Sequence, residues 1–186
     1  QVASLTLTTS STGTLSADGV LEESTKSSGW RTSNSSFSNE GFEGGGYLSF
    51  KHIGRTSYAI GISTSDGNGI NTINYGVRIN TGGNYDAINN GSILKSGVSL
   101  QTNDVFKIAR EGSDIVWYIN DSDFHRLGVQ DPNAKLYFDN AAPYSNSVIE
   151  VKMGAATISS ANYAVNTGTT PIVLDLDGDG LEYNTA

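Results

Sequence analysis

The sequence has 186 residues, a net charge of −8, 37% hydrophobic residues, 22 glycines, three prolines and no cysteine. This composition excludes collagen-like and disordered chains, and a disulfide framework is impossible. Lys and Arg total only 11, so no basic patch is available to neutralise phosphate, and we expect no nucleic-acid partner and no membrane insertion. We see no signal-peptide or transmembrane pattern, which favours a domain exported as part of a larger protein and located outside the cell, at the cell surface.

The pattern of apolar residues predicts short strands throughout the first 155 residues. We expect them at 2–8, 19–23, 46–52, 58–64, 75–80, 93–95, 104–110, 114–120, 136–138 and 148–153. No segment has helical periodicity, and strands spaced every ~8–12 residues are typical of a sandwich or barrel. We therefore predict an all-β protein, an antiparallel β-sandwich formed by residues 1–155 and followed by a linker or edge segment, 156–186, that leads to the next domain.

Residues 24–46 are rich in Ser, Asn and Gly, and we interpret them as a long loop. Its isolated aromatic residues, Trp30, Phe37 and Phe42, would fix the loop to the body of the domain. Trp30 has a functional alternative as a stacking platform for a ligand.

Two further predicted loops, 65–74 and 81–90, follow the strands at 58–64 and 75–80 and combine glycine with acidic and amide side chains. Glycine allows tight loops, and carboxylate and amide oxygens are the ligands that Ca²⁺ prefers. The density of such residues in both loops predicts a calcium-organised recognition surface, although Asn, Asp and Gly also form ordinary turns. The candidate ligands are Asp66, Asn68, Asn84, Asp86 and Asn90.

The C-terminal segment contains the most specific calcium motif in the chain. Asp175, Asp177, Asp179 and Gly180 match the first half of an EF-hand loop, D-x-D-x-D-G. Loop position 12, normally a bidentate Glu, falls on Ala186. The motif is therefore half of a metal site, or an apolar strand that runs into a solvated acidic tail.

The segment PIVLDLDGDGLE is similar to one that recurs in large RTX-type surface proteins of Gram-negative bacteria. The body, roughly residues 19–154, resembles the concanavalin-like (SPRY-like) sandwiches inserted in such adhesins, through stretches such as GGGYLSF, YAIGISTSD and NDVFKIAREGSDIVWYIND. It looks most like their peptide-binding domains, which implies calcium-dependent recognition of peptides or proteins by their C-terminal ends.

That resemblance is chemically reasonable, because a terminal carboxylate is a good ligand for a partly coordinated Ca²⁺. Asp139 and Asn140, which follow the predicted strand at 136–138, would add metal ligands from a neighbouring loop. Tyr85, Tyr144 and Trp30 are the candidates for packing against side chains of the ligand.

We predict that the protein is not an enzyme. Retaining glycoside hydrolysis needs two carboxyl groups ~5 Å apart, and no strand carries an E-x-D-x-E pattern. His52, on a strand, and His125, in a predicted loop, belong to no triad motif. Two alternatives to peptide binding remain open, namely a calcium-dependent lectin that uses the same loops and a structural spacer. We expect a monomer.

Overall fold

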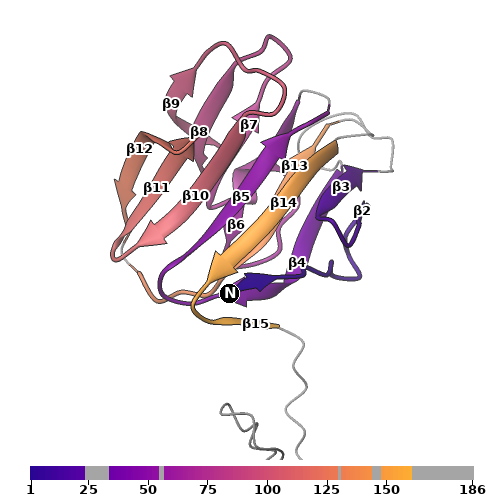
Figure 1. Ribbon diagram of the computed structural model, residues 1–186, viewed down its shortest axis with the longest axis vertical. Helices are drawn as coiled ribbons and strands as arrows, with labels where there is room; N and C mark the ends of the chain where they lie inside the picture. The colour runs from indigo at the N-terminus through magenta and orange to yellow at the C-terminus, as the bar shows by residue number, and fades with distance from the viewer. Residues whose placement is uncertain (24–33, 55–56, 130, 144–147, 161–186) are drawn as a thin grey trace, which may run out of the picture.

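The computed structural model describes residues 1–23, 34–54, 57–129, 131–143 and 148–160. Within these ranges the chain forms an eight-stranded and a seven-stranded sheet, and every strand pairing is antiparallel (Figure 1). The two sheets pack into a β-sandwich, which confirms the predicted fold class. None of the helical turns among these residues is long or apolar enough to cross a membrane.

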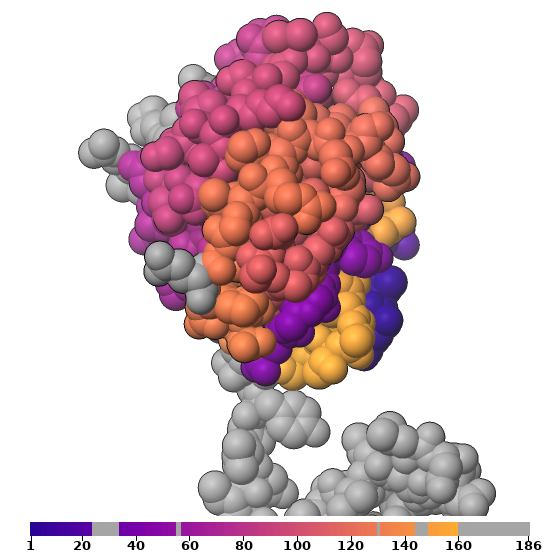
Figure 2. All heavy atoms as spheres, turned by 90° about the vertical axis from the view of Figure 1, so that its left-hand side faces the viewer, coloured from indigo at the N-terminus to yellow at the C-terminus, as the bar shows by residue number. Residues whose placement is uncertain are grey.

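The first sheet has the strand order β12-β11-β10-β5-β14-β3-β2, with β1 also paired to β14. Its strands are β1 (Val2–Ala3), β2 (Gly13–Leu15), β3 (Val20–Glu23), β5 (Gly46–His52), β10 (Val105–Glu111), β11 (Asp114–Ile119), β12 (Ser122–Gly128) and β14 (Val148–Ala155). Figure 2 views the sandwich from the side on which β12 lies, the left-hand side of Figure 1, and there β12 (orange), β5 (purple), β14 (gold) and the first strands (indigo) follow one another diagonally.

The second sheet has the order β15-β4-β13-β6-β7-β8-β9. Its strands are β4 (Asn34–Phe42), β6 (Tyr58–Ser63), β7 (Tyr75–Ile79), β8 (Tyr85–Asn89), β9 (Ser92–Gly97), β13 (Leu136–Ala142) and β15 (Ile158–Ser160). A 3₁₀ turn, η1 (Ile70–Thr72), lies in the connection between β6 and β7. Strand β15 is an edge strand, one of the two interpretations that the sequence left open for the segment after residue 155.

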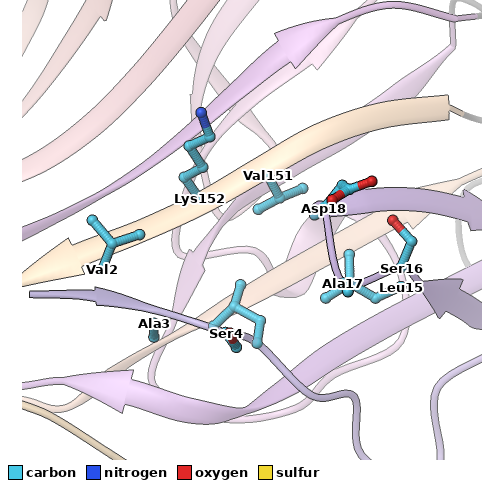
Figure 3. Close-up of a pocket in the computed structure, with 11 residues that line it drawn as sticks. Val2, Ala3, Ser4, Leu15, Ser16, Ala17, Asp18, Val151 and Lys152 are labelled. Carbon is cyan, nitrogen blue, oxygen red and sulfur yellow. The ribbon is translucent and has the colours of Figure 1, made fainter.

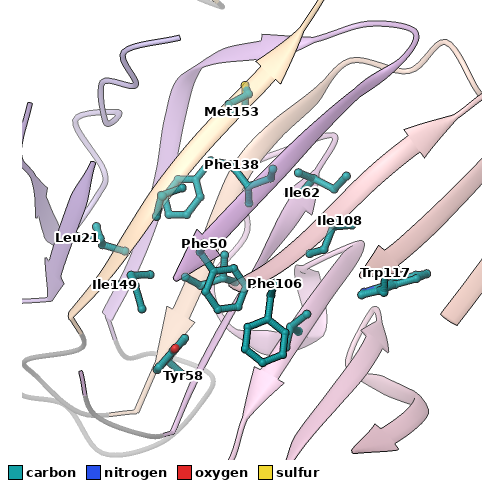
Figure 4. Packing of buried hydrophobic residues seen from close by; sticks show 14 of the residues in the cluster. Leu21, Phe50, Tyr58, Ile62, Phe106, Ile108, Trp117, Phe138, Ile149 and Met153 are labelled. Atoms are coloured by element: carbon teal, nitrogen blue, oxygen red, sulfur yellow. The ribbon is translucent and has the colours of Figure 1, made fainter. Parts of the chain in front are cut away.

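The core fills the space between the sheets, because strand alternation directs every second side chain inward (Figure 4). Phe50 and Phe106 stack at a centroid distance of 5.0 Å. Trp117 of the first sheet is fully buried and donates its Nε1–H to the carbonyl oxygen of Gly76 in the second sheet, at 2.8 Å. This bond joins the two layers at a fixed register.

The prediction of one long loop over residues 24–46 is wrong, because β4 occupies residues 34–42. Its serines lack β-propensity, but the strand lies between β13 and β15, and tertiary pairing overrides propensity. Ser36 and Ser38 are buried with their hydroxyls hydrogen-bonded. Phe37 and Phe42 are therefore strand residues rather than loop anchors.

Four other elements differ from the sequence prediction. Residues 85–89 form β8 instead of a loop, and residues 122–128 form β12, so His125 lies on a strand. Strand β13 continues through Asp139 and Asn140 to Ala142, so these two residues do not lie in a loop after the strand. At the other end of the chain, only Val2 and Ala3 of the predicted strand at 2–8 are in β1.

Candidate functional site

The candidate site is a groove of about 560 Å³ between the two sheets at one end of the sandwich, which we call the Arg110 groove. One wall comes from the second sheet and the other from β10, β11, β12 and the connection to β13. Its lining residues are Thr64, Tyr75, Asn89, Asn90, Arg110, Ile115, Leu127, Gly128, Val129, Asp131, Ala134 and Leu136.

Arg110 supplies a buried positive charge to this groove. Its residue is 2% exposed, and its guanidinium donates to the carbonyl oxygens of Gly44 at 2.6 Å and Ala134 at 2.5 Å, with a longer contact of 3.4 Å to that of Phe42. In the described part of the chain no carboxylate lies within salt-bridge distance of it. Burial lowers the pKa of Arg110, but an arginine stays protonated in proteins. Asp131, which also lines the groove, and Glu43 interact with its charge from beyond salt-bridge distance.

A network of amide side chains forms the opposite wall. Asn74 accepts at Oδ1 from the backbone N–H of Thr64 at 2.8 Å and donates from Nδ2 to Asn90 Oδ1 at 2.9 Å. Asn89 donates from Nδ2 to the carbonyl oxygen of Asn74 at 2.7 Å. These bonds fix the ends of β6, β7 and β8 relative to one another, which makes the wall a preformed surface with polar groups.

Tyr75 contributes the aromatic surface of the groove. Its ring meets Trp117 edge-on at a centroid distance of 6.4 Å, so the core supports it from behind. Burial raises the pKa of Tyr75, and the phenol stays protonated as a hydrogen-bond donor at neutral pH. Apolar Ile115, Leu127 and Leu136 complete the walls. The groove can therefore accept a ligand that combines an anionic group with apolar or ring surface.

The structure brings only some of the sequence-predicted residues to this end of the sandwich. Strand β7 is antiparallel to both β6 and β8, so the 64–74 connection and the 80–84 hairpin lie at its opposite ends. The expectation that both loops form one surface is therefore wrong. Asn90 lines the groove, and exposed Asp66 and Asn68 lie in the 64–74 connection next to Thr64.

Asn84, Tyr85 and Asp86 lie toward the other end. Asn84 is exposed in the hairpin, and Tyr85 packs edge-on against Phe106 and Phe124 at 5.3 and 5.4 Å.

Asp86 is 3% exposed and has both carboxylate oxygens occupied within the protein. Oδ2 accepts from Arg78 Nη2 at 2.7 Å, Arg78 Nε at 3.0 Å and Asn80 Nδ2 at 2.8 Å, and Oδ1 accepts from Ser96 Oγ at 2.6 Å. Burial opposes ionisation of Asp86, but these hydrogen bonds outweigh it and lower the pKa of the carboxyl. Asp86 therefore forms an internal ion pair with Arg78.

Asp139 lies on the outer face of the second sheet beneath the 64–74 connection. It is fully buried, and its Oδ2 accepts from Ser63 Oγ at 2.7 Å, whereas its Oδ1 has no hydrogen-bond partner. Burial, with a smaller contribution from the charge of Asp66, raises the pKa of Asp139 to about 8. The structure thus brings two predicted ligands, Asp66 and Asp139, close enough to interact electrostatically.

The remaining predicted residues divide into two groups. Asn140 points to the inside of the sandwich, since it faces Ile60 of the core across the strand pair, and so it lies on the opposite side of β13 from Asp139. Trp30, Tyr144, Asp175, Asp177 and Asp179 lie outside the described residues.

A second pocket, of about 210 Å³, lies between the N-terminal strand, the turn before β3 and β14 (Figure 3). Small side chains and apolar groups form most of its lining, and its charged residues, Asp18 and Lys152, extend in different directions. This pocket has less room and no converging polar groups, so the Arg110 groove is the better candidate.

Sequence reasoning missed Arg110, although the sequence carries a signal for it. Phe106, Ile108 and Arg110 alternate along one strand, and the first two face the core. An arginine in the third inward position of an apolar strand is unusual, because charged residues are rarely buried without a partner. That exception to the alternating pattern was the available clue.

Comparison with known proteins identifies the fold. No protein-family model matches the sequence, and no curated protein matches it. Solved structures that resemble it include the PSpry domain of TRIM65, with 13% identity, a TM-score of 0.58 and coverage of 80% of this chain and 92% of that one. The SPRY domain of human HERC1 gives 16% identity, a TM-score of 0.52 and coverage of 81% and 93%. The carbohydrate binding module CBM66 from Bacillus subtilis gives 11% identity, a TM-score of 0.51 and coverage of 82% of this chain and 97% of that one.

At these identities the likeness concerns the fold alone. The chain has the concanavalin-like, SPRY-like β-sandwich fold, with a groove at one end that contains a buried arginine.

Proposed function

We propose that this protein is a ligand-binding module that holds the carboxylate of a peptide C-terminus in the Arg110 groove. The observation that carries the proposal is the buried guanidinium of Arg110, which lines the groove and has no carboxylate within salt-bridge distance among the described residues. Charge-assisted bonds to a carboxylate are among the strongest hydrogen bonds, and the low dielectric of a groove strengthens them. The apolar walls and Tyr75 would contact the last side chains of the peptide.

Calcium dependence, expected from the sequence, is the second part of the proposal. Of the predicted ligands among the described residues, Asp139 is the one that has a buried carboxylate oxygen without a partner, and Asp66 is the neighbouring carboxylate. No group of three or more His, Cys, Asp or Glu side chains suited to a metal occurs in the described ranges. Asp66 and Asp139 would hold the ion together with amide, hydroxyl or backbone oxygens, which Ca²⁺ accepts readily.

The biological setting in this proposal comes from the resemblance of PIVLDLDGDGLE and of the body to RTX adhesins. The module would be exported as part of a larger bacterial adhesin, act outside the cell without catalysing a reaction, and bind C-termini of proteins on a target cell. The similar folds support a binding role, since two are SPRY domains and one is a carbohydrate binding module.

Glycan binding is the second candidate. It is favoured by the similarity to a carbohydrate binding module and by Tyr75, an aromatic surface of the kind on which sugars stack. An acidic sugar would present a carboxylate to Arg110 in the same way as a peptide C-terminus.

The test measures fluorescence anisotropy of short labelled peptides, half with a free C-terminal carboxylate and half amidated, in calcium and in excess chelator. We expect binding of the free-carboxylate peptides alone. The variant Arg110→Met keeps the length of the side chain but loses the charge, and should weaken this binding about tenfold or more. Arg126→Met is the matched control, because Arg126 is on β12 with its side chain 48% exposed and pairs with Asp114 and Glu111.

Equal binding of both peptide classes would contradict carboxylate recognition. Unchanged affinity of Arg110→Met, with its fold confirmed by circular dichroism, would contradict the role of Arg110. Loss of binding in chelator would support calcium dependence, and unchanged binding would remove it from the proposal. Binding of acidic oligosaccharides in place of peptides would favour the second candidate.

A further inference from the structure

The interior of the sandwich contains a buried polar cluster on the side of β13 opposite to Asp139. Its centre is Glu23, at the end of β3, which is 0% exposed. Leu21 of the same strand belongs to the core, so alternation directs Glu23 inward as well. Thr12 donates from Oγ1 to Glu23 Oε2 at 2.8 Å, and Ser36 of β4 donates from Oγ to Glu23 Oε1 at 2.8 Å.

The backbone of β2 at Gly13 lies close to the carboxyl group of Glu23 and restricts its position on that side. Gly13 of β2 donates its N–H to Ser36 Oγ at 3.0 Å, which fixes the direction of the hydroxyl toward Glu23. A Cβ atom at Gly13 would lie 2.7 Å from Ser36 Oγ and 3.0 Å from the Glu23 carboxyl carbon. The cluster is therefore fixed by hydrogen bonds, and it contains residues of both sheets.

Two asparagines complete the cluster with unsatisfied amides. Asn140 is 0% exposed and Asn34 is 1% exposed, and neither the oxygen nor the nitrogen of either side chain has a hydrogen-bond partner. Asn140 is paired directly with Ser36, and Asn34 is paired with Ala142 of the core, so all these side chains point inward from adjacent positions. Buried polar atoms without partners are rare in folded proteins and indicate a missing ion or water.

We propose that Glu23, Asn34, Ser36 and Asn140 bind a hard, oxygen-preferring cation inside the sandwich. Among the described residues no cationic side chain pairs with the Glu23 carboxylate, so none of them compensates its charge. The cation neutralises that charge and engages the two orphan amide oxygens, and water completes its shell and accepts from the amide N–H groups. The ion joins β3 of one sheet to β4 and β13 of the other, in a protein that has no disulfide.

This site is independent of the Arg110 groove and of the proposed Asp66–Asp139 calcium site. The test counts ions bound per chain by equilibrium dialysis and follows thermal unfolding, with Ca²⁺, Mg²⁺ or Na⁺ as the added cation. The variant Glu23→Gln should bind one ion fewer than the wild type and lose that part of the cation-dependent rise in Tm. The neighbouring residue Glu22 is exposed on the same strand, so Glu22→Gln is the matched control and should behave as the wild type.

A second variant keeps the proposal testable if Glu23→Gln does not fold. Asn140→Asp adds a carboxylate to the cluster, so it should tighten cation binding and make folding strongly dependent on the cation. The Asp139→Asn variant removes the other proposed site and should leave this ion in place. Equal ion counts in the wild type and Glu23→Gln, or equal destabilisation of Asn140→Asp with and without cation, would overturn the proposal. Anomalous diffraction from crystals grown with Tb³⁺ should show a peak among Glu23, Asn34 and Asn140, and ordered water alone at that place would also overturn it.

Discussion

The substitution Asp139→Asn tests the energetics of the outer face of the second sheet. Asp139 is fully buried, with a hydrogen bond from Ser63 and a carboxyl pKa raised from 3.8 to about 8. The folded protein therefore retains a proton that the unfolded chain releases above about pH 4. The stability that depends on this proton is fully present below the unfolded pKa of 3.8 and is lost as the pH rises toward 8.

The size of the effect follows from the difference between the two pKa values. Each unit of pKa difference corresponds to about 1.4 kcal/mol, so the metal-free wild type should lose on the order of 5 kcal/mol of unfolding free energy across this window. Asparagine has nearly the same shape and stays neutral, so Asp139→Asn should lack this contribution. Near pH 4 the variant and the wild type should have about equal stability, and near pH 8 the variant should be more stable by several kcal/mol.

The assay is urea unfolding of both proteins in excess chelator, at intervals of pH between these limits. The remaining titrating groups are common to both proteins, so the difference between their unfolding free energies isolates Asp139. Asp66→Asn is the control for a nearby exposed carboxylate, and it should change the profile only slightly. A difference that is constant with pH would refute the reasoning. Added calcium should stabilise the wild type near pH 8 more than Asp139→Asn if Asp139 is a ligand, because metal and proton compete for the same oxygen.

Three further predictions concern the packing and the internal ion pair, and each is tested by urea unfolding. Trp117→Phe removes the bond to the Gly76 carbonyl and leaves a cavity between the sheets, so it should cost about 3 kcal/mol, and a cost below about 1 kcal/mol would contradict this role. Gly19→Ala and Gly112→Ala form a matched pair, since both glycines have positive φ, +84° and +62°, but a Cβ at Gly19 would meet the Val151 carbonyl oxygen whereas Gly112 has open space. Gly112→Ala should therefore cost about 1 kcal/mol and Gly19→Ala clearly more, and equal costs would contradict the steric argument. Asp86→Asn leaves Arg78 without its carboxylate and should cost about 2 kcal/mol, in contrast to the exposed control Asp121→Asn, and equal small costs would show that the ion pair is unimportant.

The fold could be predicted from the sequence because most strands alternate clearly between apolar and polar residues. The segment DVFKIAREGSDIVWYIN contains two such runs and one turn, and it forms β10 and β11 as expected. Strand β4 could not be predicted in this way. Its sequence, NSSFSNEGF, resembles a loop, and its strand conformation depends on β13, about one hundred residues further along the chain.

The candidate site was less predictable than the fold, because it depends on which loops meet in space. Of the ligands predicted from loop composition, Asn90 does line the groove, whereas no residue of the predicted loop 65–74 does. Composition could not show that the 80–84 hairpin lies at the other end of β7, or that the Asp86 carboxylate forms an ion pair with Arg78. The positions of Arg110 and Tyr75 relative to each other depend on how the two sheets pack, and no short stretch of the sequence indicates that packing.

The strand orders have a consequence for how the chain reaches its folded state. Strand β14 lies between β5 and β3, and β13 lies between β4 and β6, so the late strands of the chain fill the middle of both sheets. Until residues 136–155 are available, β2, β3 and β4 have no connection to the rest of either sheet. Such pairings between distant segments make folding slow and cooperative, because the chain loses the entropy of loop closure before the stabilising contacts form. During synthesis both layers of the sandwich would therefore be completed only after residues 136–155 have emerged.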